Sequence, residues 1–578
     1  MADDMGKRWS SLAWQRPWLD YLLIIIAIGL AYRSSLSFRL MGDASLLIEN
    51  NQQMYSISNW WQILTSDYFD ASNPEQIGYW RPITKGSWLL ETLIGGGAHW
   101  VYELVQVSWL ALAALGVQKL AVSLGARRGW ALGAALFFGL HPSLVEAACL
   151  VQARSDLVCG AGVIWSLIGW LQWRSGVKFG LLVHVIGAVT AFGSKETAAV
   201  LPLVLACWAL FADTAHKPRS LRHLFHVLWP ACTVLTVYLV MRWLALDRSV
   251  RGGLNLSGTH LLALAGAYAQ GLLPLPLEST VRNLSPSELT SPWCMVRGAL
   301  ALLAFLASVG LAWRYHRFGI GLAAWASGSL LLVILPSKLN VPGAREMTAL
   351  ADRWLLQAVA ASATALALAG SHLVTSKVLQ QAVSFLAGGW ALLSIALGPV
   401  LHADYKDEIA LLHLEDRDYL ATPEEYRSSF ETCRFVERGL IRARIEGNID
   451  QLLTLVTTLE QRQCSMKNAN VTALTALAQA GDFSRARIFA DRILEGKGVY
   501  GRRLRVLPWI GLVLLNTGDP RRAALVLEEA RKRTIDDCFI IPMLAQARAK
   551  LGEQAVAARL LEEARHCAAT RADPQLPP

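Results

Sequence analysis

A succession of long apolar stretches in the first 400 residues constrains the fold of this 578-residue chain more than any other feature. The hydrocarbon core of a bilayer is about 30 Å thick, so roughly 20 apolar residues in a helix can cross it. We therefore predict an all-α, multi-pass membrane domain with about eleven transmembrane helices. The segment 259–275 is apolar but interrupted by Gly and Pro, and we expect it not to span. The predicted spans lie near residues 18–34, 99–122, 129–142, 157–173, 178–193, 197–212, 224–246, 294–313, 318–336, 353–370 and 379–400.

The composition changes near residue 400. Hydrophobic residues make up 54% of the chain and charged residues only 17%, whereas about a quarter of a soluble globular protein is charged. Of the first 400 positions 47 are charged, against 51 of the last 178. This contrast excludes a cytosolic enzyme. It predicts a membrane domain at 1–400, a connector at 401–420, a soluble domain at 421–570 and a tail at 571–578.

Basic residues in short loops predict the orientation, because Lys and Arg are enriched on the cytoplasmic side. With the N-terminus in the cytoplasm, the cytoplasmic segments hold thirteen Lys or Arg and three Asp, which accounts for the whole net charge of +10. Eleven spans then place residues 401–578 outside the cytoplasm. Short loops favour a bacterial inner membrane, with the C-terminal domain in the periplasm. A basic patch interleaved with aromatic residues is missing from the sequence, so nucleic acid is not an expected partner.

Acidic and basic residues occur together at the predicted outer ends of the spans. Ionisable groups at a bilayer edge are costly unless they are paired or hydrated, so we expect a polar cavity that opens outward. Any single residue could instead be an interfacial anchor. Fixed cations would stabilise a lipid-linked phosphate as a leaving group, and a carboxylate could deprotonate an acceptor hydroxyl. The residues are Asp43, Arg81, Glu146, Arg154, Asp156, Lys195, Glu196, Arg345, Glu346, Asp352 and Arg353.

Eight short motifs follow one another along residues 20–420. They are Gly42-Asp43, Asp67-Tyr68-Phe69, Tyr79-Trp80-Arg81-Pro82, His141-Pro142, Ala153-Arg154-Ser155-Asp156, Ser194-Lys195-Glu196-Thr197, Asp352-Arg353-Trp354 and Tyr405-Lys406-Asp407-Glu408. Each is a weak signal alone. In this order they resemble the TMTC family, the transmembrane and tetratricopeptide-repeat O-mannosyltransferases of the GT-C glycosyltransferase superfamily.

The resemblance implies a GT-C fold and a polyprenyl- or dolichyl-phosphate sugar as donor. It also implies a catalytic Asp in the first outer loop, residues 35–98, and Asp43 matches this position as general base. His141 and Pro142 match a motif that we expect to shape the end of a span. The residues expected to bind or orient the donor phosphate and sugar are Arg81, Glu146, Arg154, Asp156, Lys195, Glu196 and Arg353.

The chain departs from the family pattern in two places. Asp43 lies between Gly42 and Ala44, where the family commonly has paired acids, and Glu103 and Gln106 stand where the family has His and Asn. Both departures leave the sugar and the acceptor open. No Cys or His spacing indicates a zinc site, and no cofactor is expected besides the lipid-linked sugar, with metal dependence left open.

An internal repeat occupies residues 421–570. A period near 34 with Gly in a first helix and a small residue in a second is typical of tetratricopeptide repeats. We therefore predict an extracytoplasmic, TPR-like α-solenoid, with an irregular helical bundle as the alternative. Its groove would either present an acceptor protein or hold a partner complex. The repeated glycines are Gly447, Gly481, Gly518 and Gly552, and Ala486, Ala523 and Ala557 follow the last three by five positions.

Four of the nine cysteines lie in this soluble domain and form two pairs by spacing. Cys433 and Cys464 are 31 residues apart, and Cys538 and Cys567 are 29 apart. An oxidising compartment would allow the disulfides Cys433–Cys464 and Cys538–Cys567. Four buried free thiols are the alternative.

Three functions stay open from the sequence. The favoured one is a membrane glycosyltransferase that moves a sugar from a polyprenyl-phosphate-type lipid to a hydroxyl, such as Ser or Thr of a secreted protein. A transporter or flippase with a periplasmic interaction domain would place ionisable residues at mid-span, whereas here they lie mostly at outer ends. An inactive membrane-anchored scaffold would not need Asp43, Arg154 and Lys195.

Overall fold

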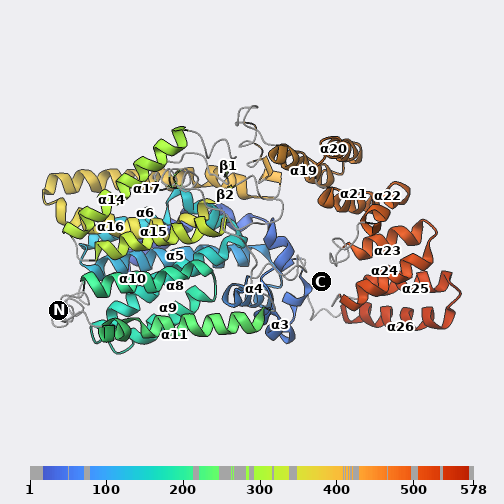
Figure 1. Ribbon diagram of the computed structural model, residues 1–578, viewed down its shortest axis with the longest axis horizontal. Helices are drawn as coiled ribbons and strands as arrows, with labels where there is room; N and C mark the ends of the chain where they lie inside the picture. Colours follow the sequence, from blue (N-terminus) through green and yellow to red (C-terminus); the bar gives the residue numbers. More distant parts are fainter. Residues whose placement is uncertain are drawn as a thin grey trace. The chain divides into compact units, whose positions relative to one another are not determined.

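The computed structural model of the chain is almost entirely helical (Figure 1). Its two compact units comprise Met1–Ser45, Trp60–Tyr68 and Gly78–Leu411 in the first, and Leu46–Asn59, Phe69–Ile77 and Leu412–Pro578 in the second. The structure describes residues 17–49, 51–69, 79–212, 221–246, 292–315, 318–337, 348–407, 429–464, 466–495, 506–533 and 538–571, with isolated positions between 262 and 284 and between 409 and 420.

The first unit is a bundle of long helices joined by short helical segments. Two short strands, β1 (Arg282–Leu284) and β2 (Thr348–Leu350), pair antiparallel. The helices are α2 (Pro17–Ala31), α3 (Trp60–Thr65), α4 (Pro82–Gly95), α5 (His99–Leu124), α6 (Arg128–Gly139), α7 (Val145–Cys149), α8 (Arg154–Arg174), α9 (Gly180–Phe192), α10 (Val200–Cys207), α11 (Leu221–Ala245), α14 (Pro292–Tyr315), α15 (Gly319–Ser337), α16 (Leu356–Leu373) and α17 (Lys377–His402). The short segments are η1 (Arg33–Ser37), η5 (Pro142–Leu144), η6 (Val151–Ala153), η7 (Glu196–Ala199), η8 (Trp208–Ala212), η9 (Asp352–Leu355) and η10 (Ala403–Tyr405). Three further short segments lie almost entirely in the stretch Leu46–Asn59 of the second unit: η2 (Ser45–Glu49), η3 (Gln52–Tyr55) and η4 (Ile57–Asn59).

Four of the described helical segments are long and apolar enough to cross a membrane. The bent pair Arg128–Gly139 and Pro142–Cys149, with 53° between its halves, makes a fifth if it counts as one span. These helices support a membrane protein, while the count of eleven spans stays a prediction. Most of segment 259–275 lies outside the described residues. The four segments are His99–Leu124, Leu224–Ala245, Asp352–Leu373 and Lys377–Tyr405.

Most residues of α8 are buried, and the helix packs closely against α9. Small residues let the two backbones meet, as is common between membrane helices. A Cβ atom on Gly162 would lie 2.6 Å from the Ala191 nitrogen, and one on Gly187 would lie 2.5 Å from the Ser166 nitrogen. The contact therefore depends on the absence of side chains at these positions.

We predict that Gly169→Ala destabilises the protein by about 1–3 kcal/mol, the usual cost of overpacking. A Cβ there would lie 2.2 Å from the backbone nitrogen of His184, so α8 and α9 would have to move apart. Thermal unfolding of the purified protein in detergent measures the effect. The matched control is Gly133→Ala in α6, where a Cβ meets nothing within 4 Å. Equal stability of the two variants would contradict the close helix contact.

The described part of the second unit contains four helical hairpins in sequence. The two helices of each hairpin pack together, and the first helix of each hairpin also packs against the first helix of the next. In Figure 1 these are the orange to red helices. Consecutive stacking of this kind is the architecture of helical-repeat proteins. The helices are α19 (Ser429–Ile445), α20 (Ile449–Gln461), α21 (Lys467–Gln479), α22 (Phe483–Glu495), α23 (Leu507–Asn516), α24 (Pro520–Arg533), α25 (Ile540–Lys550) and α26 (Gln554–Arg571).

The repeated glycines lie in the turns of these hairpins, so the expectation of a glycine inside the first helix was wrong. All four have positive φ, between +70° and +84°. This left-handed conformation ends a helix and carries no steric penalty for Gly. The alanines five positions later lie in the second helices and are buried. They are Ala486, Ala523 and Ala557.

A disulfide joins Cys433 and Cys464, with 5.7 Å between their Cα atoms. It links α19 to the connection between α20 and α21. Cys538 is also disulfide-bonded. The side chain of Cys567, the partner expected from the sequence, lies outside the described residues.

Candidate functional site

Six of the predicted charged residues lie where short helical segments meet the ends of longer helices in the first unit. The segment η5 packs against η9, and α7 packs against both η9 and α8. Side chains from α7, α8, η7 and η9 form ion pairs with one another and with Arg81 and Lys195. We call this set the charged cluster: Arg81, Glu146, Asp156, Lys195, Glu196 and Arg353.

Asp156 connects two cations of the charged cluster. One of its carboxylate oxygens accepts a hydrogen bond from Lys195 Nζ at 2.5 Å, and the other lies 3.9 Å from Arg353 Nε. The Arg353 guanidinium also forms an ion pair with Glu146, whose other carboxylate oxygen accepts the Arg353 backbone N–H at 3.0 Å. Arg353 is thus fixed through both its backbone and its side chain, from two separate elements.

Arg81 is held between aromatic rings and the same group of charges. Its Cζ lies 4.8 Å from the ring centres of both Tyr68 and Tyr79. Its Nη2 lies 3.1 Å from a Glu196 carboxylate oxygen, and its Nη1 donates to Ser155 Oγ at 3.3 Å. Cation–π contacts on a planar guanidinium favour Arg over Lys at this position.

Asp43 lies between η1 and η2, and its backbone is bonded to Gln152 in η6, the segment before α8. Its N–H donates to the Gln152 side-chain oxygen at 2.8 Å. Gly42 has a φ of +56°, and a Cβ there would lie 2.7 Å from that same oxygen. The glycine therefore permits this contact, which gives a local reason for one departure from the family pattern. Nothing in the sequence singled out Gln152.

Asp43 is accessible to solvent, but protein surrounds it closely enough to change its acidity. Burial raises the pKa of its carboxyl above the ordinary value of about 4, and the positive charge of Arg353 opposes this rise. The structure therefore brings Asp43 within the electrostatic reach of the charged cluster. An accessible carboxylate with a raised pKa is suited to act as a general base.

A small cavity lies beside the charged cluster, with an empty volume of about 220 Å³ that includes space open to solvent. Arg353 and Asp156 form part of its wall. Its polar lining also includes Thr197 and Gln357, and the Gln357 amide nitrogen donates to Thr197 Oγ1 at 3.2 Å. Arg353 and Asp156 of the charged cluster therefore border a space that a polar group could enter.

Arg154 differs from the other predicted cations, Arg81, Lys195 and Arg353, because its side chain is fully buried. Its two Nη atoms contact the Glu91 carboxylate at 2.5 and 3.1 Å. They also donate to Ser87 Oγ at 3.3 Å and to the Tyr102 carbonyl oxygen at 2.8 Å, while Nε donates to the Gln106 side chain. All five guanidinium N–H groups are thus used inside the protein. This geometry favours a positioning role for Arg154 over direct contact with phosphate.

Gln106 connects Arg154 by hydrogen bonds to the segment that carries Glu146. Its amide nitrogen donates to the carbonyl oxygens of Ala147 at 2.5 Å and Leu150 at 3.1 Å. The departure from the family pattern at this position therefore has a structural role. Sequence reasoning missed Glu91, although an acidic residue within an apolar helix is itself a signal of a buried partner.

His141 and Pro142 lie at the bend between α6 and α7. The buried His141 accepts a hydrogen bond from the Ser143 backbone N–H at 3.3 Å and so caps η5, in which Pro142 is the first residue. Both residues thus shape the chain. Among the described residues, no group of three or more His, Cys, Asp or Glu is arranged to hold a metal ion.

Comparisons with known proteins agree on one activity. The chain is 28% identical over 153 residues to the mouse protein O-mannosyl-transferase TMTC2, covering 26% of this chain and 18% of that protein. It is 25% identical over 307 residues to fruit fly Tmtc2, covering 49% and 32%. It is 29% identical over 154 residues to human TMTC2, covering 26% and 18%.

The chain is distantly similar to protein O-mannosyltransferases. The matched part spans about a third or less of the length of each of these relatives. No protein-family model and no solved structure matches the chain. The similarity supports a TMTC-like relationship and, for the activity, a glycosyltransferase.

Proposed function

We propose that this protein is a GT-C-type membrane glycosyltransferase that moves a sugar from a polyprenyl-phosphate-type lipid to a hydroxyl group. The acceptor is Ser or Thr of a secreted protein, and the reaction takes place on the extracytoplasmic face. One observation carries the proposal: Asp43, an accessible carboxylate of raised pKa, lies in the field of Arg353 of the charged cluster, in a membrane protein similar to O-mannosyltransferases.

In the proposed reaction Asp43 takes the proton of the acceptor hydroxyl as that oxygen attacks the anomeric carbon of the sugar. The new carbon–oxygen bond forms while the bond from the anomeric carbon to the phosphate oxygen breaks. The phosphate leaves on the lipid with the electron pair, and the configuration at the anomeric carbon is inverted. Lys195 and Arg353 stabilise the charge that develops on the leaving phosphate.

Lys195 has N–H donors that can contact the leaving phosphate. Lys195 has three N–H groups and Asp156 takes one at 2.5 Å. Burial lowers the pKa of Lys195, and the charge of Asp156 opposes this shift. Glu146 and Asp156 fix the direction of Arg353 and so pre-organise the site. Arg81 and Glu196 orient the other charges of the site or contact the sugar.

The second unit is proposed to be a TPR-like solenoid that presents the acceptor protein. Stacked hairpins usually bind extended polypeptides along one face. The disulfide between Cys433 and Cys464 supports an extracytoplasmic, oxidising location, such as the periplasm of a bacterium with the N-terminus in the cytoplasm.

A comparison of secreted proteins from cells with and without this gene tests the proposal. We expect glycopeptides whose Ser or Thr carries a hexose-sized mass to disappear on deletion and to return with the wild-type gene. Intact-mass spectrometry with site mapping names both the sugar and the acceptor. An unchanged set of modified peptides, with the protein present at normal levels in complemented cells, would count against the acceptor class.

A further inference from the structure

One short stretch of the chain, residues 142–153, contacts both the proposed base and a cation of the charged cluster. It comprises η5, α7 and η6. In η6, the side-chain oxygen of Gln152 accepts the Asp43 backbone N–H at 2.8 Å. In α7, Glu146 forms an ion pair with Arg353 and accepts its backbone N–H at 3.0 Å. Groups on a single stretch therefore hold both Asp43 and Arg353.

Asp43 lies in a tight turn of the backbone. The turn is closed by the Ala44 N–H, which donates to the Met41 carbonyl oxygen at 3.2 Å, and Gly42 within it has a φ of +56°. The Asp43 N–H is not used by the turn, and Gln152 accepts it. A backbone N–H can only donate, so the amide of Gln152 must present its oxygen to it. This contact fixes the backbone from which the Asp43 carboxylate extends.

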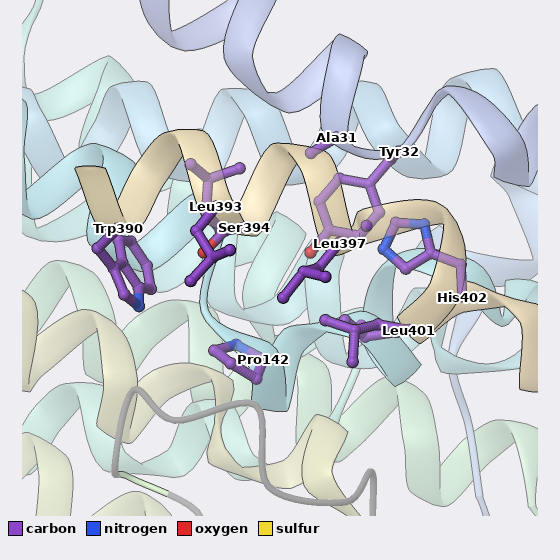
Figure 2. A pocket seen from close by; sticks show the side chains of 12 residues that line it. Ala31, Tyr32, Pro142, Trp390, Leu393, Ser394, Leu397, Leu401 and His402 are labelled. Carbon is purple, nitrogen blue, oxygen red and sulfur yellow. The ribbon is translucent and has the colours of Figure 1, made fainter. Parts of the chain in front are cut away.

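The stretch 142–153 is itself held along its length. Pro142, at its start, lines a cavity together with side chains of α17 (Figure 2). In its middle, the Gln106 amide nitrogen donates to two backbone carbonyl oxygens, at 2.5 and 3.1 Å. Directly after it, Arg154 is fully buried and paired with Glu91. A firm support of this kind keeps a reacting group within the small tolerance that catalysis requires.

Arg353 and Tyr68 are the titratable side chains that interact with Asp43 in the described part of the chain. The positive charge of Arg353 acts on the Asp43 carboxyl, and the charge of Asp43 acts on the Tyr68 phenol. The Tyr68 hydroxyl also donates to the Gln152 backbone carbonyl oxygen at 3.5 Å. Gln152 is neutral, so it holds Asp43 without changing the charge around the carboxyl. A charged side chain at this position would change the ionisation of Asp43.

We propose that Gln152 is the positioning residue of the base. It holds the backbone of Asp43 where the carboxylate reaches the acceptor hydroxyl, while Glu146 on the same stretch holds Arg353 for the leaving phosphate. The inference rests on the proposed function, because it assigns Gln152 a role in that reaction. Gly42 belongs to the same arrangement, since a Cβ atom there would lie 2.7 Å from the Gln152 side-chain oxygen and displace it.

The test compares two substitutions in the full-length protein. Gln152→Met keeps the length of the side chain but removes the oxygen, whereas Gln152→Glu keeps an oxygen for the Asp43 N–H and adds a negative charge. The matched control is Gln62→Glu, at an exposed position of α3. Transfer from polyprenyl-phosphate sugar to a Ser/Thr-containing peptide gives kcat and KM across pH. Carbodiimide labelling of Asp43 without substrate, mapped by mass spectrometry at each pH, reports its ionisation, and thermal unfolding checks the fold.

We expect Gln152→Met to lower kcat by up to about 100-fold, the effect of a small misplacement of a reacting group, with little change in KM for either substrate. Gln152→Glu should recover most of kcat at pH values where Asp43 is ionised. Its added charge should move the labelling midpoint of Asp43, and the acid limb of the activity, to higher pH, because a like charge raises the pKa of a carboxyl group. Gln62→Glu should match the wild type.

Gly42→Ala acts on the same contact from the other side. It should also lower kcat, and its combination with Gln152→Met should cost little more than Gln152→Met alone, because the two changes are coupled. Wild-type kcat in Gln152→Met, no recovery in Gln152→Glu, or an unmoved labelling midpoint would overturn the inference. The labelling needs no sugar donor. A wild type that transfers no sugar, while Gln152→Glu still moves the Asp43 midpoint, would refute the proposed function and leave Gln152 as the residue that holds Asp43.

Discussion

Replacing Asp43 with Asn lowers kcat for sugar transfer by about 10²–10⁴-fold, the range for loss of a general base. The amide keeps the size of the side chain but cannot accept the acceptor proton. The Asp43 backbone N–H, which donates to Gln152, is unchanged by the substitution. We therefore expect normal folding and nearly normal donor binding, so the loss appears in kcat more than in KM.

The matched control for this prediction is Glu49→Gln, which makes the same change of charge at an exposed position six residues later in the chain. It should keep wild-type activity. The wild-type pH profile gives a second test, because the base must be ionised and burial raises the pKa of Asp43. Activity should fall as the pH decreases through that raised pKa, at a higher pH than for an ordinary Asp carboxyl. Full activity of Asp43→Asn would exclude Asp43 as the base.

Replacing Arg154 with Met destabilises the protein by about 3–5 kcal/mol, because it leaves the Glu91 carboxylate buried without its partner. Arg154 is fully buried, and the Glu91 side chain is only 6% exposed. The same change also removes the donor to Gln106, which holds the carbonyl oxygens of Ala147 and Leu150. Thermal unfolding in detergent measures the loss.

The double variant Arg154→Met with Glu91→Leu separates a buried ion pair from a general intolerance of this position. Removal of both charges should restore most of the stability lost in the single variant, since apolar replacements of buried ion pairs are often neutral. Arg39→Met, at an exposed position, should change stability by less than about 0.5 kcal/mol. A double variant no more stable than Arg154→Met would show that Glu91 is not the partner that matters.

The sequence predicted the residue types of the candidate site better than their roles. Arg81, Lys195 and Arg353 were identified from charges at the ends of apolar segments, and the structure brings them into one cluster. Arg154 belonged to the same pattern, yet it is buried against Glu91, 63 residues earlier in the chain. A sequence pattern shows that a charge in an apolar segment needs a partner but not which partner it has.

The repeats show the same limit at the level of the fold. Their spacing predicted paired helices, and the structure contains stacked helical hairpins. The period did not show where each glycine lies within the repeat, because a glycine is favoured both by close helix packing and by a left-handed turn. The positive φ of Gly481 and of the other three repeated glycines shows that they lie in the turns.

The most direct test of the account is sugar transfer by the purified protein from radiolabelled polyprenyl-phosphate sugar to a Ser/Thr-containing acceptor peptide. We predict release of free polyprenyl phosphate and equal labelling of the acceptor by the wild type and by Glu49→Gln, and neither product from Asp43→Asn. The assay is repeated with the acceptor proteins identified in cells. If the folded wild-type protein binds the lipid but never cleaves its sugar–phosphate bond, the central claim is contradicted.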